Sequence, residues 1–138
     1  MKKENIVLPK GNSKQDIIDR RNLIKSRLKP LVGRNVICPD LDSSPVAISN
    51  DSINEICHHA AKSYRSTLAA LDLLNQIKIA KFYKYCKPKP NSQTKEHGFL
   101  LMIEMHGTLD GYPTKLMIGV RVKNAHERLL QYCITAQD

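Results

Sequence analysis

Residues 52–66, SINEICHHAAKSYRS, form the segment around which the predicted fold is arranged. Hydrophobic and small side chains recur in it at spacings of three and four residues, which places them on one side of a helix. These side chains are Ile53, Ile56, Cys57, Ala60, Ala61 and Tyr64. Ser52 followed by Glu55 fits a capping box, so we expect this helix to begin at Ser52.

The opposite side of this helix is predicted to carry ionisable groups. At about 100° per residue, His58 lies one turn from Lys62, and Glu55 lies one turn from His59. A polar helix face of this kind is most often simply solvated. Histidine titrates near neutral pH, however, so two histidines beside a cation also suit proton transfer or phosphate recognition.

The composition predicts one domain that attracts polyanions. Of the 138 residues, 41% are hydrophobic, which is enough for a single core. The 22 Lys and Arg residues exceed the 13 Asp and Glu residues and give a formal charge of +9. A nucleic acid is therefore the leading partner class, although many small basic proteins bind none. No segment resembles a signal peptide or a membrane span, so we expect a cytoplasmic location.

The four cysteines are spaced too widely for a zinc site and are expected to be reduced, mostly buried thiols. They are Cys38, Cys57, Cys86 and Cys133. We expect neither a metal nor a cofactor. A Cys/His enzyme would require Cys57 or Cys133 to be exposed with a depressed pKa, whereas Cys57 falls on the apolar side of its helix.

An amphipathic helix is also predicted over residues 13–31, with Ser13 as its cap and with Pro30 and Gly33 at its end. Its outer face is expected to be basic, through Arg20, Arg21, Lys25, Arg27 and Lys29. We expect residues 1–33 to belong to the same domain as residues 34–138. Another helix is predicted over residues 66–78, separated from the central helix by a break at Arg65 and Ser66.

Strands dominate the remainder of the prediction. Short strands are expected at 35–38 and 46–48, and the hydrophobic period changes from 3.6 to 2 after Ile79. The later strands are predicted at residues 80–87, 97–105, 112–123 and 129–135. Asp110–Gly111 predicts a hairpin between the second and third of these. The expected fold class is α+β, with N-terminal helices packed on a C-terminal four-stranded antiparallel sheet.

Alternation within the last two strands predicts one face covered by helices and one face available to a ligand. The covered face is expected to hold Leu116, Ile118, Val120 and Val122, with Leu130, Tyr132 and Ile134. The available face is expected to hold Lys115, Arg121 and Lys123, with Gln131, Cys133 and Thr135. A site that combines these cations with the histidines of the helix would contain the groups needed for RNA cleavage. One imidazole takes the 2′-hydroxyl proton, a second acid protonates the leaving oxygen, and Lys or Arg stabilises the phosphate charge.

Four segments in this order resemble the phage and mobile-element domains of the barnase, EndoU, colicin-tRNase and RelE-like (BECR) nuclease superfamily. They are VAISNDSINEICHHAAKSYRSTLAAL (46–71), GFLLMIEMHG (98–107), KLMIGVRVK (115–123) and LLQYCITA (129–136). The resemblance covers residues 35–136 and rests on the order of these segments and on their residue patterns. It implies metal-independent RNA cleavage, a toxin or effector role, RNA such as tRNA as partner, and a cognate antitoxin or immunity protein.

The resemblance also implies which positions form the site. The catalytic positions it implies are His58 or His59, Lys62, Lys115, Arg121 and Thr135, with Tyr132 a weaker hydroxyl. Further nucleic-acid contacts are expected from Lys87, Lys89, Lys123 and Tyr132. His97 and His106 are each either the second acid or an ordinary strand-end histidine. Glu104 lies in the most apolar strand and Glu55 is expected in the cap, so neither is clearly placed as the base.

The same residues are also compatible with a different class of function, that of a binding domain without catalytic activity. A catalytically inactive member of the superfamily would bind nucleic acid or a protein as an accessory domain of a phage or mobile element. A cleft that unites the histidines with the strand cations would favour the nuclease, and its absence would favour the accessory domain.

Overall fold

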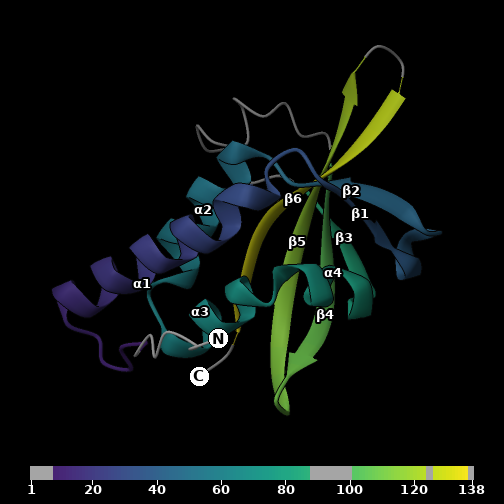
Figure 1. Ribbon diagram of the computed structural model, residues 1–138. Helices are drawn as coiled ribbons and strands as arrows, with labels where there is room; N and C mark the ends of the chain where they lie inside the picture. The colour runs from purple at the N-terminus through teal and green to yellow at the C-terminus, as the bar shows by residue number, and fades with distance from the viewer. Residues whose placement is uncertain (1–7, 88–100, 124–125, 137–138) are drawn as a thin grey trace, which may run out of the picture.

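Helices cover one face of a mixed sheet, which confirms the predicted α+β class (Figure 1). The structure is a computed structural model that describes residues 8–87, 101–123 and 126–136. Its α-helices are α1 (Lys14–Leu28), α2 (Asn50–Ala60), α3 (Tyr64–Leu71) and α4 (Leu73–Ile79). No helix in the described ranges has the length and apolar character needed to cross a membrane.

The sheet has six strands rather than the predicted four. They are β1 (Asn35–Cys38), β2 (Ser44–Ala47), β3 (Lys81–Cys86), β4 (Leu101–Leu109), β5 (Tyr112–Lys123) and β6 (His126–Ala136). Their order is β1-β2-β6-β5-β4-β3. The last four strands of the chain form the expected antiparallel set. The two short early strands extend it, because β2 pairs in parallel with β6 and β1 pairs with β2.

Helix boundaries follow the available caps. Ser13 caps α1 as predicted, and its side chain accepts a hydrogen bond from the backbone N–H of Asp16. In contrast, the capping residue of α2 is Ser49, three residues before the predicted Ser52. Ser49 is the first hydroxyl after β2, and it forms a reciprocal capping box with Ser52. The predicted break at Arg65 and Ser66 lies earlier, where Ser63 caps α3. The helix predicted over residues 66–78 is divided at Asp72 into α3 and α4.

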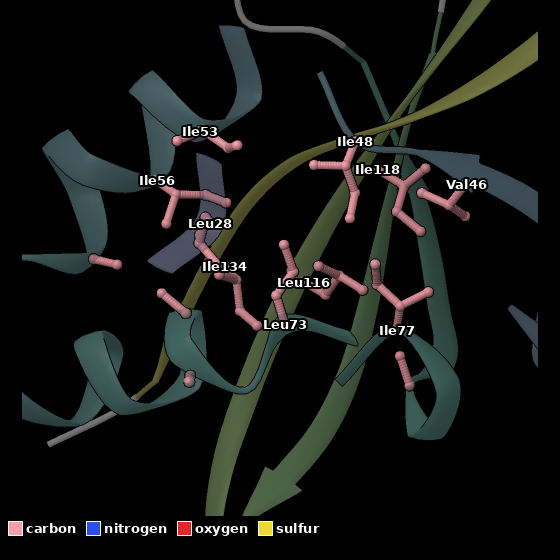
Figure 2. Packing of buried hydrophobic residues seen from close by; sticks show 14 of the residues in the cluster. Leu28, Val46, Ile48, Ile53, Ile56, Leu73, Ile77, Leu116, Ile118 and Ile134 are labelled. Atoms are coloured by element: carbon pink, nitrogen blue, oxygen red, sulfur yellow. The ribbon is translucent and has the colours of Figure 1, made fainter. Parts of the chain in front are cut away.

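The core lies between these helices and the sheet. Figure 2 shows Leu73 and Ile77 of α4 beside Leu116 and Ile118 of β5, and Ile56 of α2 beside Leu28 of α1 and Ile134 of β6. All of these side chains are buried, and Val120 is buried with them. The prediction that the helices cover Ile118 and Val120 is therefore confirmed.

Two strands each contain one extra residue, and in both strands the extra residue is a tyrosine. In β3 the register shifts between Phe82 and Lys84, which leaves Tyr83 additional. In β6 Cys133 pairs with Met117 while Gln131 pairs with Ile118, so Tyr132 is additional. Such β-bulges interrupt the strict alternation of side chains.

The bulge in β6 makes part of the predicted orientation of this strand wrong. Gln131 is fully buried in the helix-covered side instead of facing outwards. Tyr132, predicted to face the core, packs with Met117 and Met102 on the other side. Ile134 is buried as predicted, because it lies after the bulge and pairs with the buried Leu116.

Arg20 was predicted on the outer basic face of α1 but is fully buried. Its Nε donates a hydrogen bond of 2.8 Å to the carbonyl of Ala61, and its Nη1 donates one of 2.9 Å to the carbonyl of Pro9. The long side chain thus reaches the last carbonyls of α2, where backbone acceptors lack intrahelical partners. It joins α1, the end of α2 and the segment before α1.

The connection between β1 and β2 reaches round to the far edge strand of the sheet. It contains a short 3₁₀ helix, Pro39–Leu41, in which the Asp40 carboxylate accepts a 2.6 Å hydrogen bond from the backbone N–H of Phe82. The ammonium group of Lys81 lies 3.8 Å from the same carboxylate. The start of β3 is therefore held by a segment that lies 42 residues earlier in the sequence.

We expect Arg20→Ala to lower the free energy of unfolding by about 3 kcal/mol, because hydrogen bonds from a charged donor are removed and buried carbonyls lose their partners. Urea denaturation measures the change as a lower midpoint with an unchanged slope. Arg27→Ala on the exposed side of the same helix is the matched control and should shift the midpoint little. Equal shifts in both variants would contradict this role of Arg20.

Gln131→Met is expected to stabilise the protein by about 1 kcal/mol. The side-chain amide of Gln131 is buried, and neither its nitrogen nor its oxygen has a hydrogen-bond partner in the described part of the chain. A methionine of similar shape removes the unsatisfied polar atoms and keeps the packing. A lower thermal midpoint for Gln131→Met would show that the amide is satisfied in the folded protein.

Candidate functional site

The face of the sheet turned away from the helices, here called the open face, carries two rows of functional side chains. Adjacent strands place directly paired residues side by side, about 5 Å apart. One row consists of His106 on β4, Lys115 on β5 and Thr135 on β6. The neighbouring row consists of Glu104, Met117 and Cys133 on the same three strands.

His106 and Glu104 form a close pair at the β4 end of these rows. Nε2 of His106 lies 2.6 Å from Oε2 of Glu104, and the imidazole is 44% exposed. Residues two apart on a strand share a face, so the sequence spacing Glu-x-His creates this contact. The carboxylate holds one ring nitrogen and thereby orients the imidazole. A cavity of about 330 Å³ is lined by this pair with Lys115 and Thr135.

A second histidine–carboxylate pair lies on α2. Nε2 of His59 is 3.2 Å from Oε2 of Glu55, one helical turn away, and the His59 side chain is 49% exposed. Glu55 does not serve in the capping box, which Ser49 and Ser52 form. Its buried carboxylate is instead hydrogen-bonded to the Tyr132 side chain. Burial and then the Glu55 charge raise the pKa of Tyr132 to about 12, so the phenol stays protonated as the donor.

The charges of Glu55 and Lys115 both influence the thiol of Cys133. Burial raises its pKa to about 12, with a further increase from the charge of Glu55 and a smaller decrease from the charge of Lys115. The open face carries the His106–Glu104 pair on β4, Lys115 on β5 and Cys133 on β6. The His59–Glu55 pair lies on α2 and is joined to β6 by the hydrogen bond between Glu55 and Tyr132.

The same observations exclude the Cys/His enzyme. That hypothesis requires a thiol with a depressed pKa at Cys57 or Cys133. Burial raises the pKa of Cys57, with smaller decreases caused by the charges of Lys25 and Arg21 on α1, and it also raises that of Cys133. Both thiols are thereby kept protonated near neutral pH.

Some predicted site residues lie away from this arrangement. His58 is exposed and lies about 100° around α2 from His59, turned away from Glu55. Lys62 is exposed just beyond the end of α2. Arg121 is six residues along β5 from Lys115, a separation of about 20 Å, so the two cannot contact one phosphate.

The other predicted contacts fall at or beyond the limits of the structure. Lys87 is exposed immediately after β3, at the end of that strand farthest from Lys81. Lys89 and His97 lie outside the described residues, and the Lys123 side chain also lies outside them. Of the residues predicted from the sequence, Lys115 and Thr135 line one cavity with His106, and His59 and Tyr132 both contact Glu55.

Glu104 and Tyr83 were missed as site residues. A carboxylate two residues before a histidine in an otherwise apolar strand was the available signal for Glu104. The ring of Tyr83 stacks on that of His106, with centroids 4.0 Å apart and planes 19° apart. Its position depends on the bulge in β3, for which the sequence contains no evident mark.

No protein-family model, curated protein or solved structure matches this chain. Within the described ranges, no three His, Cys, Asp or Glu side chains are grouped as metal ligands. A functional assignment therefore has to be drawn from the geometry of the open face.

We expect Cys133 to resist alkylation by iodoacetamide at about pH 8, because only the thiolate reacts and a pKa of about 12 leaves it protonated. Peptide mass spectrometry should find Cys133 labelled in urea but not in the folded protein. Glu55→Gln removes a charge that raises this pKa, so labelling of the folded variant should begin at a lower pH. Equal labelling of Cys133 in folded and unfolded protein would refute the assigned environment.

Proposed function

We propose that this chain is a metal-independent ribonuclease-type domain of the BECR kind that binds single-stranded RNA across the open face. One observation carries the proposal. His106, held by the Glu104 carboxylate, lies with Lys115 and Thr135 around one cavity, and a second histidine–carboxylate pair, His59–Glu55, lies on α2, where Glu55 is hydrogen-bonded to Tyr132 of β6. Two imidazoles and a cation are the groups that RNA transphosphorylation requires.

In the proposed reaction, His106 acts as the base and His59 acts as the acid. His106 takes the proton of a ribose 2′-hydroxyl, whose oxygen attacks the adjacent phosphorus. The bond from phosphorus to the 5′-oxygen breaks, and His59 gives that oxygen a proton. The products are a 2′,3′-cyclic phosphate and a 5′-hydroxyl end. Lys115 stabilises the additional negative charge on the phosphorane, and Thr135 can donate a hydrogen bond to it.

The dimensions of the sheet are compatible with this division of roles. Two strand spacings separate β4 from β6, which is about 10 Å between backbones. His106 would contact a phosphate above Lys115 from β4, and we propose that His59 reaches the same phosphate from α2, which contacts β6 through Glu55 and Tyr132. Glu104 and Glu55 act as positioning residues, because each holds one nitrogen of its histidine.

The biological role that we propose is that of a toxin or effector of a phage or mobile element. The formal charge of +9 favours a polyanionic target, of which tRNA is one example. A cognate antitoxin or immunity protein would then restrain it, and its RNA target would lie in the cytoplasm. The alternative, an inactive accessory domain, would keep the same basic face for binding without cleavage.

We expect His106→Gln and His59→Gln each to lower the rate of RNA cleavage by about 100-fold or more, because each removes an acid–base group. Lys115→Gln should lower it by a similar factor through lost charge stabilisation. Cleavage is measured by gel electrophoresis of total RNA in the presence of EDTA. His58→Gln is the matched control on α2 and should cleave at the wild-type rate.

Two results would count against this mechanism. Loss of cleavage in His58→Gln with full activity in His59→Gln would show that His58, and not His59, acts as the acid. Salt-sensitive RNA binding without any cleavage by the wild type would support the inactive accessory domain instead.

A further inference from the structure

The edge strand β3 presents an aromatic ring and two cations beside the proposed catalytic pair. In the described strand order β3 ends the sheet, and its first five residues are exposed. Lys81 pairs with His106, and Lys84 pairs with Glu104, so both lysines belong to the open face. The bulge adds Tyr83 to that face, between the two lysines.

One side of the Tyr83 ring is already used, and the other is accessible. The ring lies on the His106 imidazole at 4.0 Å, yet 56% of Tyr83 is exposed. Lys84 Nζ lies 5.7 Å from the ring centroid, at the outer limit of a cation–π contact. Such a weak surface contact gives way readily, and the ammonium group remains near enough to bind a phosphate.

The remaining aromatic residues of β3 have a different environment. Phe82 and Tyr85 contact each other with centroids 4.9 Å apart, and they pair with Met105 and Ile103 on the helix-covered side. Each ring therefore has the other as an apolar neighbour, although Phe82 is 40% exposed and Tyr85 is 61% exposed. Tyr83 instead lies among ionisable groups, where burial of apolar surface does not explain its position.

We propose that Tyr83 is the platform on which an unpaired nucleobase stacks, next to the phosphate that is cleaved. The incoming base continues the stack that begins with His106 and Tyr83, while Lys84 neutralises a neighbouring phosphate. Lys81, whose ammonium group lies 3.8 Å from the Asp40 carboxylate, adds a partly compensated charge. This subsite rests on the ribonuclease function proposed above and narrows its substrate. A base within a duplex is stacked on both sides, so only single-stranded RNA can occupy the platform.

The stack also links substrate binding to catalysis. Glu104 holds one edge of the His106 ring, and Tyr83 covers one face of it. A base that presses on Tyr83 restricts the same imidazole further. Tyr83 is therefore a binding residue that also positions His106.

The test separates binding from cleavage by using single-stranded DNA that contains 2-aminopurine. This DNA lacks the 2′-hydroxyl nucleophile, and stacking on a ring quenches its fluorescence. We expect Tyr83→Ser to weaken binding by about tenfold and to remove the quenching, because stacking is lost. Tyr83→Phe should retain both. Tyr85→Ser is the matched control, since Tyr85 is 61% exposed on the same strand but belongs to the other side.

Each outcome decides the proposal. Unchanged binding in Tyr83→Ser, equal weakening in Tyr85→Ser, or equal affinity of the wild type for duplex DNA overturns the platform. Tyr83-dependent binding with no RNA cleavage by the wild type supports the platform and rejects the nuclease. RNA cleavage by the wild type together with binding that does not depend on Tyr83 supports the nuclease and rejects the platform. Thermal unfolding of all three variants confirms that each is folded.

Discussion

Strict alternation of side chains along an extended strand is the constraint that determines the open face. An inserted residue places two consecutive side chains opposite a single partner on the next strand. In β3 these two are Tyr83 and Lys84 opposite Glu104, and in β6 they are Tyr132 and Cys133 opposite Met117. Each bulge tyrosine contacts one of the two histidine–carboxylate pairs. The geometry of the site therefore depends on the two bulges as well as on the identity of the residues in these strands.

Local signals in the sequence were sufficient for much of the fold. Ser13 predicted the start of α1, and Asp110–Gly111 predicted the hairpin, where both residues have positive φ. The alternation in residues 112–123 predicted β5 and the side of it that the helices cover. These features depend on neighbouring residues, so a single sequence contains them.

Features that depend on distant parts of the chain were not predictable in the same way. The parallel pairing of Val46 with Leu129 joins segments on either side of three helices. Arginine is usually a surface residue, and the burial of Arg20 is explained by its hydrogen bonds to the carbonyls of Ala61, Pro9 and Gly11. For the site, helical spacing predicted the contact between Glu55 and His59. The choice between His58 and His59 required knowledge of which side of α2 faces β6.

The carboxylate of Asp40 has a consequence for the behaviour of the protein at high concentration. A sheet that ends in an exposed strand can recruit a strand from another molecule, which leads to aggregation. At the end of this sheet, one backbone donor of Phe82 is already occupied by Asp40, and the bulge at Tyr83 interrupts a flat pairing surface. Lysines at 81 and 84 add mutual repulsion between copies. The aromatic edge can thus remain available to a ligand without becoming a template for fibril growth.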